Sequence, residues 1–130
     1  MIRAHVDAVL SLLTGASSVP VYDGRAPDTA PAAYRVLYAD GGKATVTSTS
    51  GQSSWREWSF QTTAVGTSPA QARLVAEKNQ AALLDATPTV SGRNCGPIRH
   101  DTSRDVERDD DVTPPVFYAV DRWRFTSLPA

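Results

Sequence analysis

The feature that most constrains this chain is a long alternating run, Trp55 to Gly66, that leads directly into a helix-start signal. Alternate positions point to opposite faces of a β-strand. One face of the run would therefore carry Trp58, Phe60, Thr62 and Ala64, and the other face would carry Glu57, Ser59, Gln61 and Thr63. The pattern predicts a long strand with one apolar face, which needs a partner layer to cover it.

The residues after this strand predict a helix. Ser68 suits the cap position, Pro69 suits the first helical turn, and Gln71 can close a capping box. The helix should run to about Asp85 with its small inner residues packed closely on the sheet. The predicted inner stripe is Ala72, Val75, Ala76, Asn79 and Leu83.

The remaining elements follow from weaker patterns. An apolar stripe predicts a first helix over 2–14 with Gly15 as its stop, and strands are expected near 19–22, 34–38, 89–90 and 116–125. On the last strand Phe117, Ala119, Trp123 and Phe125 should share one face. The order predicts an α+β fold: an antiparallel sheet of about four strands with two helices packed on one face. We expect a single domain over 1–130, with long loops at about 39–54 and 98–115.

Length and charge exclude several classes of protein. A chain of 130 residues suits one domain, and a formal net charge of −1 argues against a general polyanion binder. The sequence holds one cysteine, so no intramolecular disulfide framework is possible. No apolar run approaches the ~20 residues of a membrane span, so no membrane partner is expected.

The chain offers little that could carry catalysis. His5, Cys95 and His100 do not have metal-ligand spacing, and the glycines match no nucleotide-binding pattern. We therefore expect no metal, no cofactor and no enzymatic activity. Two alternatives stay open: a small thiol enzyme that uses Cys95 with His100, and a single-stranded nucleic-acid binder that uses Trp123 with its neighbouring arginines.

Several short segments, taken in order along nearly the whole chain, point to a known family. They are the helix 5–10, Val21 to Gly24 before a proline-rich turn, 34–38 before a Gly/Ser/Thr-rich loop, Phe60 to Gly66, Ser68 to Arg73, Gly92-Arg93, Pro97-Ile98, and Val116 to Trp123. Together they resemble the tail terminator, or tail completion, proteins of long-tailed bacteriophages, especially those of actinobacteria.

The resemblance implies a structural role. Such a protein forms a ring, expected to be a homohexamer, at the head-proximal end of the tail tube, where it ends tube polymerisation and joins tail to head. The implied partners are the major tail tube protein and a head–tail connector or head-completion protein, with DNA only as cargo through the ring. The implied location is the tail–neck region of the virion, after assembly in the host bacterial cytoplasm. The alternative within this class is another head–tail connector or head-completion neck protein.

Two polar segments become candidate subunit-interface or lumen loops under this hypothesis. One is the loop before the central strand, Gly41 to Ser54; the other is the acidic run near the end of the chain. The candidate residues are Gly41, Gly42, Lys43, Thr45, Thr47, Asp105, Asp109, Asp110 and Asp111. A charged loop with local ion pairs is the simpler interpretation of the acidic run.

Overall fold

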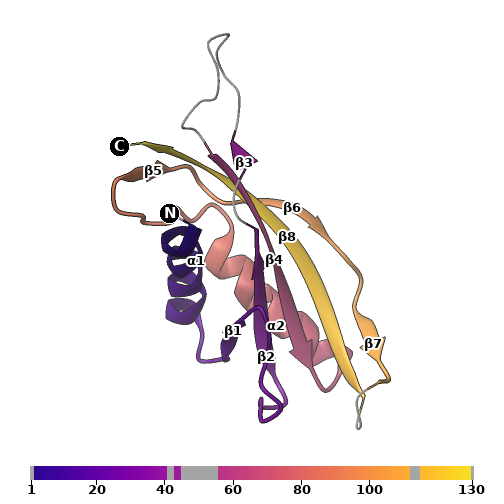
Figure 1. Ribbon diagram of the computed structural model, residues 1–130. Helices are drawn as coiled ribbons and strands as arrows, with labels where there is room; N and C mark the ends of the chain where they lie inside the picture. The colour runs from indigo at the N-terminus through magenta and orange to yellow at the C-terminus, as the bar shows by residue number, and fades with distance from the viewer. Residues whose placement is uncertain (1, 41–42, 45–55, 112–114, 130) are drawn as a thin grey trace.

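The computed structural model describes residues 2–40, 43–44, 56–111 and 115–129 (Figure 1). Its two helices are α1 (Ile2–Ala16) and α2 (Pro69–Leu83). Its strands are β1 (Val21–Asp23), β2 (Tyr34–Ala39), β3 (Lys43–Ala44), β4 (Arg56–Gly66), β5 (Arg93–Cys95), β6 (Arg99–Ser103), β7 (Glu107–Asp109) and β8 (Val116–Pro129).

Within the described residues, eight strands form one sheet built around β4 and β8. These two strands pair antiparallel from Arg56 opposite Ser127 to Gly66 opposite Phe117. The other edge of β4 pairs with β2 and β3, and the other edge of β8 pairs in turn with β5, β6 and β7. The predicted α+β class and the two helices are confirmed. The sheet is larger than the four strands predicted, and it is not wholly antiparallel, because β1 runs parallel to β2.

The prediction of a loop over 98–115 is wrong for much of that segment. It supplies β6 and β7, which pair with β8 along the sheet edge, with a bulge between His100 and Thr102. Every residue of β6 is exposed, so no apolar alternation marks it as a strand. Its backbone hydrogen bonds to β8 and the contact of His100 with Asp121 hold it in place, and a polar strand is common at a sheet margin. The strand expected near Thr89 and Val90 does not form, although Val90 is buried.

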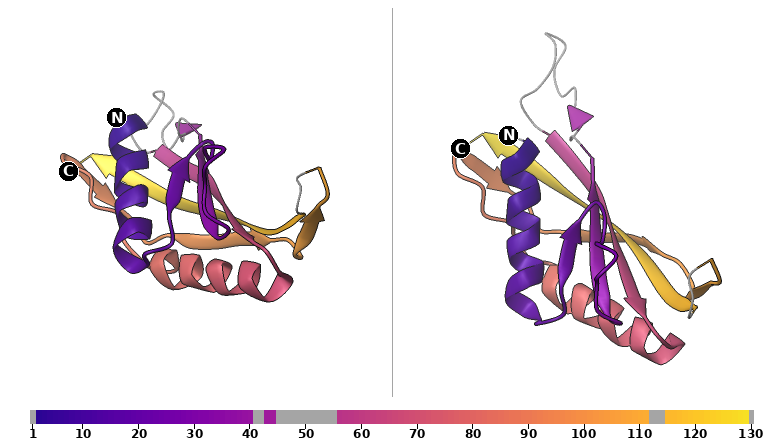
Figure 2. Two further views of the ribbon diagram at one scale, coloured as in Figure 1. Left: turned by 90° about the horizontal axis from the view of Figure 1, so that it is seen from below. Right: turned by 60° about the horizontal axis from the view of Figure 1, so that its bottom comes forward.

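Both helices pack on the same face of the sheet, and Figure 2 shows α1 and α2 close to each other. The predicted facing of the long strand is confirmed, since Trp58 and Phe60 are buried beneath the helices. The main core cluster is Val9, Leu13, Leu37, Trp58, Phe60, Leu83, Ile98, Trp123 and Phe125. Burial of this apolar surface is the chief force that joins the layers.

The start of α2 forms much as its sequence predicts. The Ser68 hydroxyl accepts a hydrogen bond from the Gln71 backbone N–H at 3.1 Å. The Gln71 side-chain oxygen accepts from the Thr67 backbone N–H at 2.7 Å, one residue before the cap position. The predicted inner stripe of α2 is confirmed residue for residue. Gly66 is needed beside this turn, because a Cβ there would lie 2.8 Å from the Ala72 backbone nitrogen.

The first helix differs from its prediction in two ways. It continues through Gly15 to Ala16, and Ile2, the first residue of the predicted apolar stripe, is exposed, whereas His5 is buried. The His5 ring stacks on Trp58 with ring centroids 4.3 Å apart, and its Nε2 lies 2.8 Å from the Ser127 hydroxyl. A histidine can therefore take a core position that hydrophobic spacing alone assigns to aliphatic side chains.

Candidate assembly surfaces

The face of the sheet opposite the helices is the first candidate surface, and no described helix covers it (Figure 2). It holds a hollow of about 480 Å³ that we call the open-face hollow. Tyr34, Tyr38 and Tyr118 line it, and residues 24–26 stand at its rim. The hydroxyl-bearing aromatic side chains make this surface suitable for contact with another protein, since tyrosines are enriched at interfaces.

A short polar network fixes one wall of this hollow. The Tyr118 hydroxyl donates to one Glu107 carboxylate oxygen at 2.6 Å, and Arg104 donates to the other at 3.0 Å. The Tyr118 hydrogen bond and the Arg104 charge hold the pKa of Glu107 below its ordinary value. The same hydrogen bond raises the pKa of Tyr118. The wall is thus held by interactions between β7 and β8.

Two arginines of β8 extend the same face beyond the hollow. Arg122 lies opposite Gln61 and donates to its side-chain oxygen at 3.3 Å. Arg124 lies opposite Ser59 and is exposed, and its side chain forms no hydrogen bond or ion pair with any residue that the structure describes. We call Arg122 and Arg124 the basic stripe.

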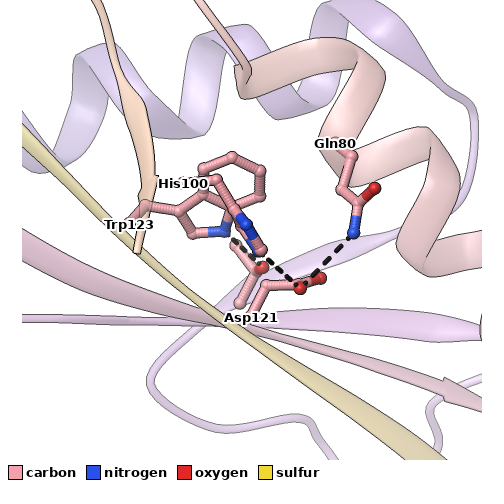
Figure 3. Close-up of polar contacts among 5 residues, drawn as sticks. Gln80, His100, Asp121 and Trp123 are labelled. Carbon is pink, nitrogen blue, oxygen red and sulfur yellow. Dashed lines mark hydrogen bonds and ion pairs between the residues drawn. The ribbon is translucent and has the colours of Figure 1, made fainter. Parts of the chain in front are cut away.

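A buried polar cluster lies on the helix side of β8 (Figure 3). The Asp121 side chain is only 3% exposed. One of its oxygens lies 3.0 Å from His100 Nε2 and 3.4 Å from the Gln80 side-chain nitrogen. The neighbouring Trp123 indole donates to the Thr62 hydroxyl at 3.0 Å. These contacts tie β6, α2 and β4 to the central part of β8.

The cluster lies at the floor of a second concave surface, which we call the helix-side groove. Its volume is about 550 Å³. Arg73, Glu77 and Gln80 of α2 form one wall, residues 103–106 form the other, and Ala119 and Asp121 lie at the base. The groove therefore joins exposed charges at its walls to a buried carboxylate beneath them.

The acidic residues that the sequence offers as interface candidates lie on both concave surfaces. Asp105 lines the helix-side groove, whereas Asp109 lines the open-face hollow. Asp110 pairs with Arg108 at 2.6 Å, and the Asp111 backbone N–H donates to Asp109 at 3.0 Å. The acidic run is therefore spread over two faces rather than gathered into one cluster.

The loop candidates are placed only in part. Lys43 belongs to β3, where it lies opposite Glu57. Gly41, Gly42, Thr45 and Thr47 lie outside the described residues. Their proposed position at an interface stays a prediction.

The structure does not bring together the residues of the thiol-enzyme alternative. His100 pairs with Trp123 on β8, whereas Cys95 pairs with Ser127 of the same strand. These partners are four positions apart on β8, which corresponds to about 13 Å along the strand. Among the described residues, no group of three or more His, Cys, Asp or Glu side chains could hold a metal ion. None of the described helices is long and apolar enough to cross a membrane.

Sequence reasoning missed Asp121, although the signal was present. Strict alternation from Ala119 to Trp123 places Asp121 on the same buried face. A carboxylate on an apolar strand face needs polar partners. That requirement predicts a buried polar contact, but the partner residues, Gln80 and His100, come from distant segments and cannot be found from spacing.

The comparisons with known proteins identify the fold. No protein-family model matches the sequence, and no curated protein matches it. Among solved structures, a chain of the virion of a native gene transfer agent particle matches with a TM-score of 0.73 and 15% identity, covering 97% of this chain and 96% of that one. A second solved protein matches with a TM-score of 0.69 and 19% identity, covering 99% and 94%. The whole fold is therefore shared with these proteins.

Proposed function

We propose that this chain is a virion structural protein that forms the tail terminator ring of a long-tailed, phage-like particle. The observation that carries the proposal is the full-length likeness to a chain of a gene transfer agent virion. The ordered sequence segments that resemble tail terminators support the finer role. In this role the chain forms a homohexameric ring, ends tube polymerisation, binds the tail tube protein on one side and meets the head connector on the other.

The two concave surfaces fit a chain that works by assembly rather than by catalysis. The open-face hollow and the helix-side groove lie on opposite sides of one sheet. A subunit with different surfaces on opposite sides can make head-to-tail contacts, which close into a ring when the rotation between copies allows. Each contact should bury about 1,000 Å² or more in total.

Deletion of the gene for this chain from the set of genes that encode the particle tests the proposal. We expect tails of abnormal length that do not join heads, visible by negative-stain electron microscopy, and recovery when the intact chain is supplied in trans. Gold labelling of a tagged chain should mark the junction of head and tail. Tails of normal length that still carry heads would contradict the proposal. Gold on the connector of heads that have no tail would favour the head-completion alternative.

A further inference from the structure

We propose that the helix-side groove of one copy receives the basic stripe of a second copy, with Arg124 directed at the Asp121 carboxylate. This contact would join neighbouring subunits of the ring. The inference therefore rests on the ring proposed above and names the two surfaces through which its subunits bind each other.

Among the described residues, the carboxylate at the floor of the groove has no permanently charged cation beside it. Asp121 lines the groove although its side chain is almost fully buried. Gln80 is a neutral donor, and His100 carries a charge only when it is protonated. Removing a carboxylate from water is costly unless a cation compensates it. A basic side chain that enters the groove would supply that cation.

The groove walls favour the same kind of guest. Arg104 lines the groove but already pairs with Glu107 at 3.0 Å. Among the lining residues this leaves one cation, Arg73, against the carboxylates of Glu77, Asp105 and Asp121. The surplus of negative charge favours a guanidinium, whose planar fork suits carboxylate partners.

The chain itself carries the matching cations on its other side. The basic stripe lies on the open face of β8, and the Arg124 side chain has no hydrogen-bond or ion-pair partner among the described residues. Because Asp121 and Arg124 point to opposite faces of β8, one molecule cannot satisfy its own groove. A second copy can, and the contact is then heterologous and repeatable around a ring. Such charge pairs set the register between subunits more than the affinity.

Charge reversal with complementation tests this contact. The stripe variant carries Arg122→Glu and Arg124→Glu; the groove variant carries Glu77→Lys, Asp105→Lys and Asp121→Asn. Each is expressed alone in cells that hold the particle's other genes but lack this chain. We expect each variant to reduce the yield of tailed particles about tenfold or more, because like charges then meet at the joint.

Co-expression of the two variants should restore tailed particles. The acidic stripe of one variant fits the basic groove of the other, and the reverse contact is the native one, so alternating copies can close an even-numbered ring. Thermal unfolding of each purified variant shows whether it is folded. Arg3→Glu and Asp28→Lys are the matched controls, since both residues are exposed and neither lines the helix-side groove or belongs to the basic stripe; they should assemble like the intact chain.

A milder pair keeps the test decisive if the reversed variants unfold. Arg124→Gln and Asp121→Asn should each reduce assembly, and the double variant should lose no more than the worse single variant, because both remove one interaction. Three results would overturn the contact. Co-expression could fail to rescue variants that are folded, or either charge-reversed variant could assemble like the intact chain. In the milder pair, the losses of assembly from the two single variants could add up in the double variant. Normal head-joined tails without the chain would instead overturn the ring itself.

Discussion

The two faces of the β4–β8 pair show how one set of strands meets two different demands. On the helix face Phe60 lies opposite Trp123, and both side chains are buried. In the adjacent pair, on the open face, Gln61 lies opposite Arg122, and Arg122 is exposed. The first pair stabilises the subunit by excluding water, whereas the second pair keeps the open face polar and accessible at this point of the sheet. Substitutions of the buried side chains on the helix face should therefore change folding, and those of the exposed arginines on the open face should change assembly.

The largest expected effect comes from the centre of the helix face. Trp123→Ala should lower the free energy of unfolding by ~3–5 kcal/mol, because it removes a buried aromatic ring and leaves a cavity. The same change at Arg124, the next residue on the opposite face, should stay within about 0.5 kcal/mol. Chemical denaturation of the two variants measures both values. Equal losses of unfolding free energy in the two variants would show that the two faces of β8 do not differ in their contribution to folding.

A polar residue on the helix face should also affect folding. Asp121→Ala leaves the donors of His100 and Gln80 without their acceptor, which should cost about 1–2 kcal/mol of unfolding free energy. Asp105→Ala, at the exposed wall of the same groove, is the matched control and should change stability by less than about 0.5 kcal/mol. Equal stability of the two variants by urea titration would mean that the buried cluster does not stabilise the subunit.

The helix that covers the sheet offers a smaller test. Ser68→Ala removes the hydroxyl that accepts from the Gln71 backbone, and we expect a loss of about 1 kcal/mol. Ser68→Thr keeps an acceptor and should retain most of that stability. A thermal melt that ranks the alanine variant equal to the intact chain would show that the cap contributes nothing to α2.

The parts of the fold that the sequence predicts are those with a local cause. The Ser68 cap and the alternation through Trp58 depend on neighbouring residues, so spacing alone reveals them. The His5 position in the core depends on Ser127 and Trp58, which lie far away in the sequence. β6 has no buried residue at all and exists because β8 offers a free edge.

The candidate site shows the same division. The acidic run around Asp105 and Asp109 is visible in the sequence as a dense cluster of charge, and both residues line concave surfaces. Their separation onto two faces is set by the course of β6 and β7 along β8, which the sequence pattern does not predict. Charge density therefore points to residues that line concave surfaces, but only the tertiary structure assigns each of them to a face of the sheet.

The smallest expected effect tests the wall of the open-face hollow through its pH dependence. The pKa of Glu107 is lowered from its ordinary value of 4.5 by Tyr118 and Arg104. A carboxyl whose pKa is lowered by folding adds stability above its unfolded pKa, and this stability is lost as pH falls through the folded pKa. Tyr118→Phe should return the Glu107 pKa towards 4.5, as measured by NMR titration of its side-chain carboxyl carbon. The stability difference between the variant and the intact chain should be present at neutral pH and should shrink in acid below that value. A difference that is independent of pH would place the effect of Tyr118 in packing rather than in its hydrogen bond to Glu107.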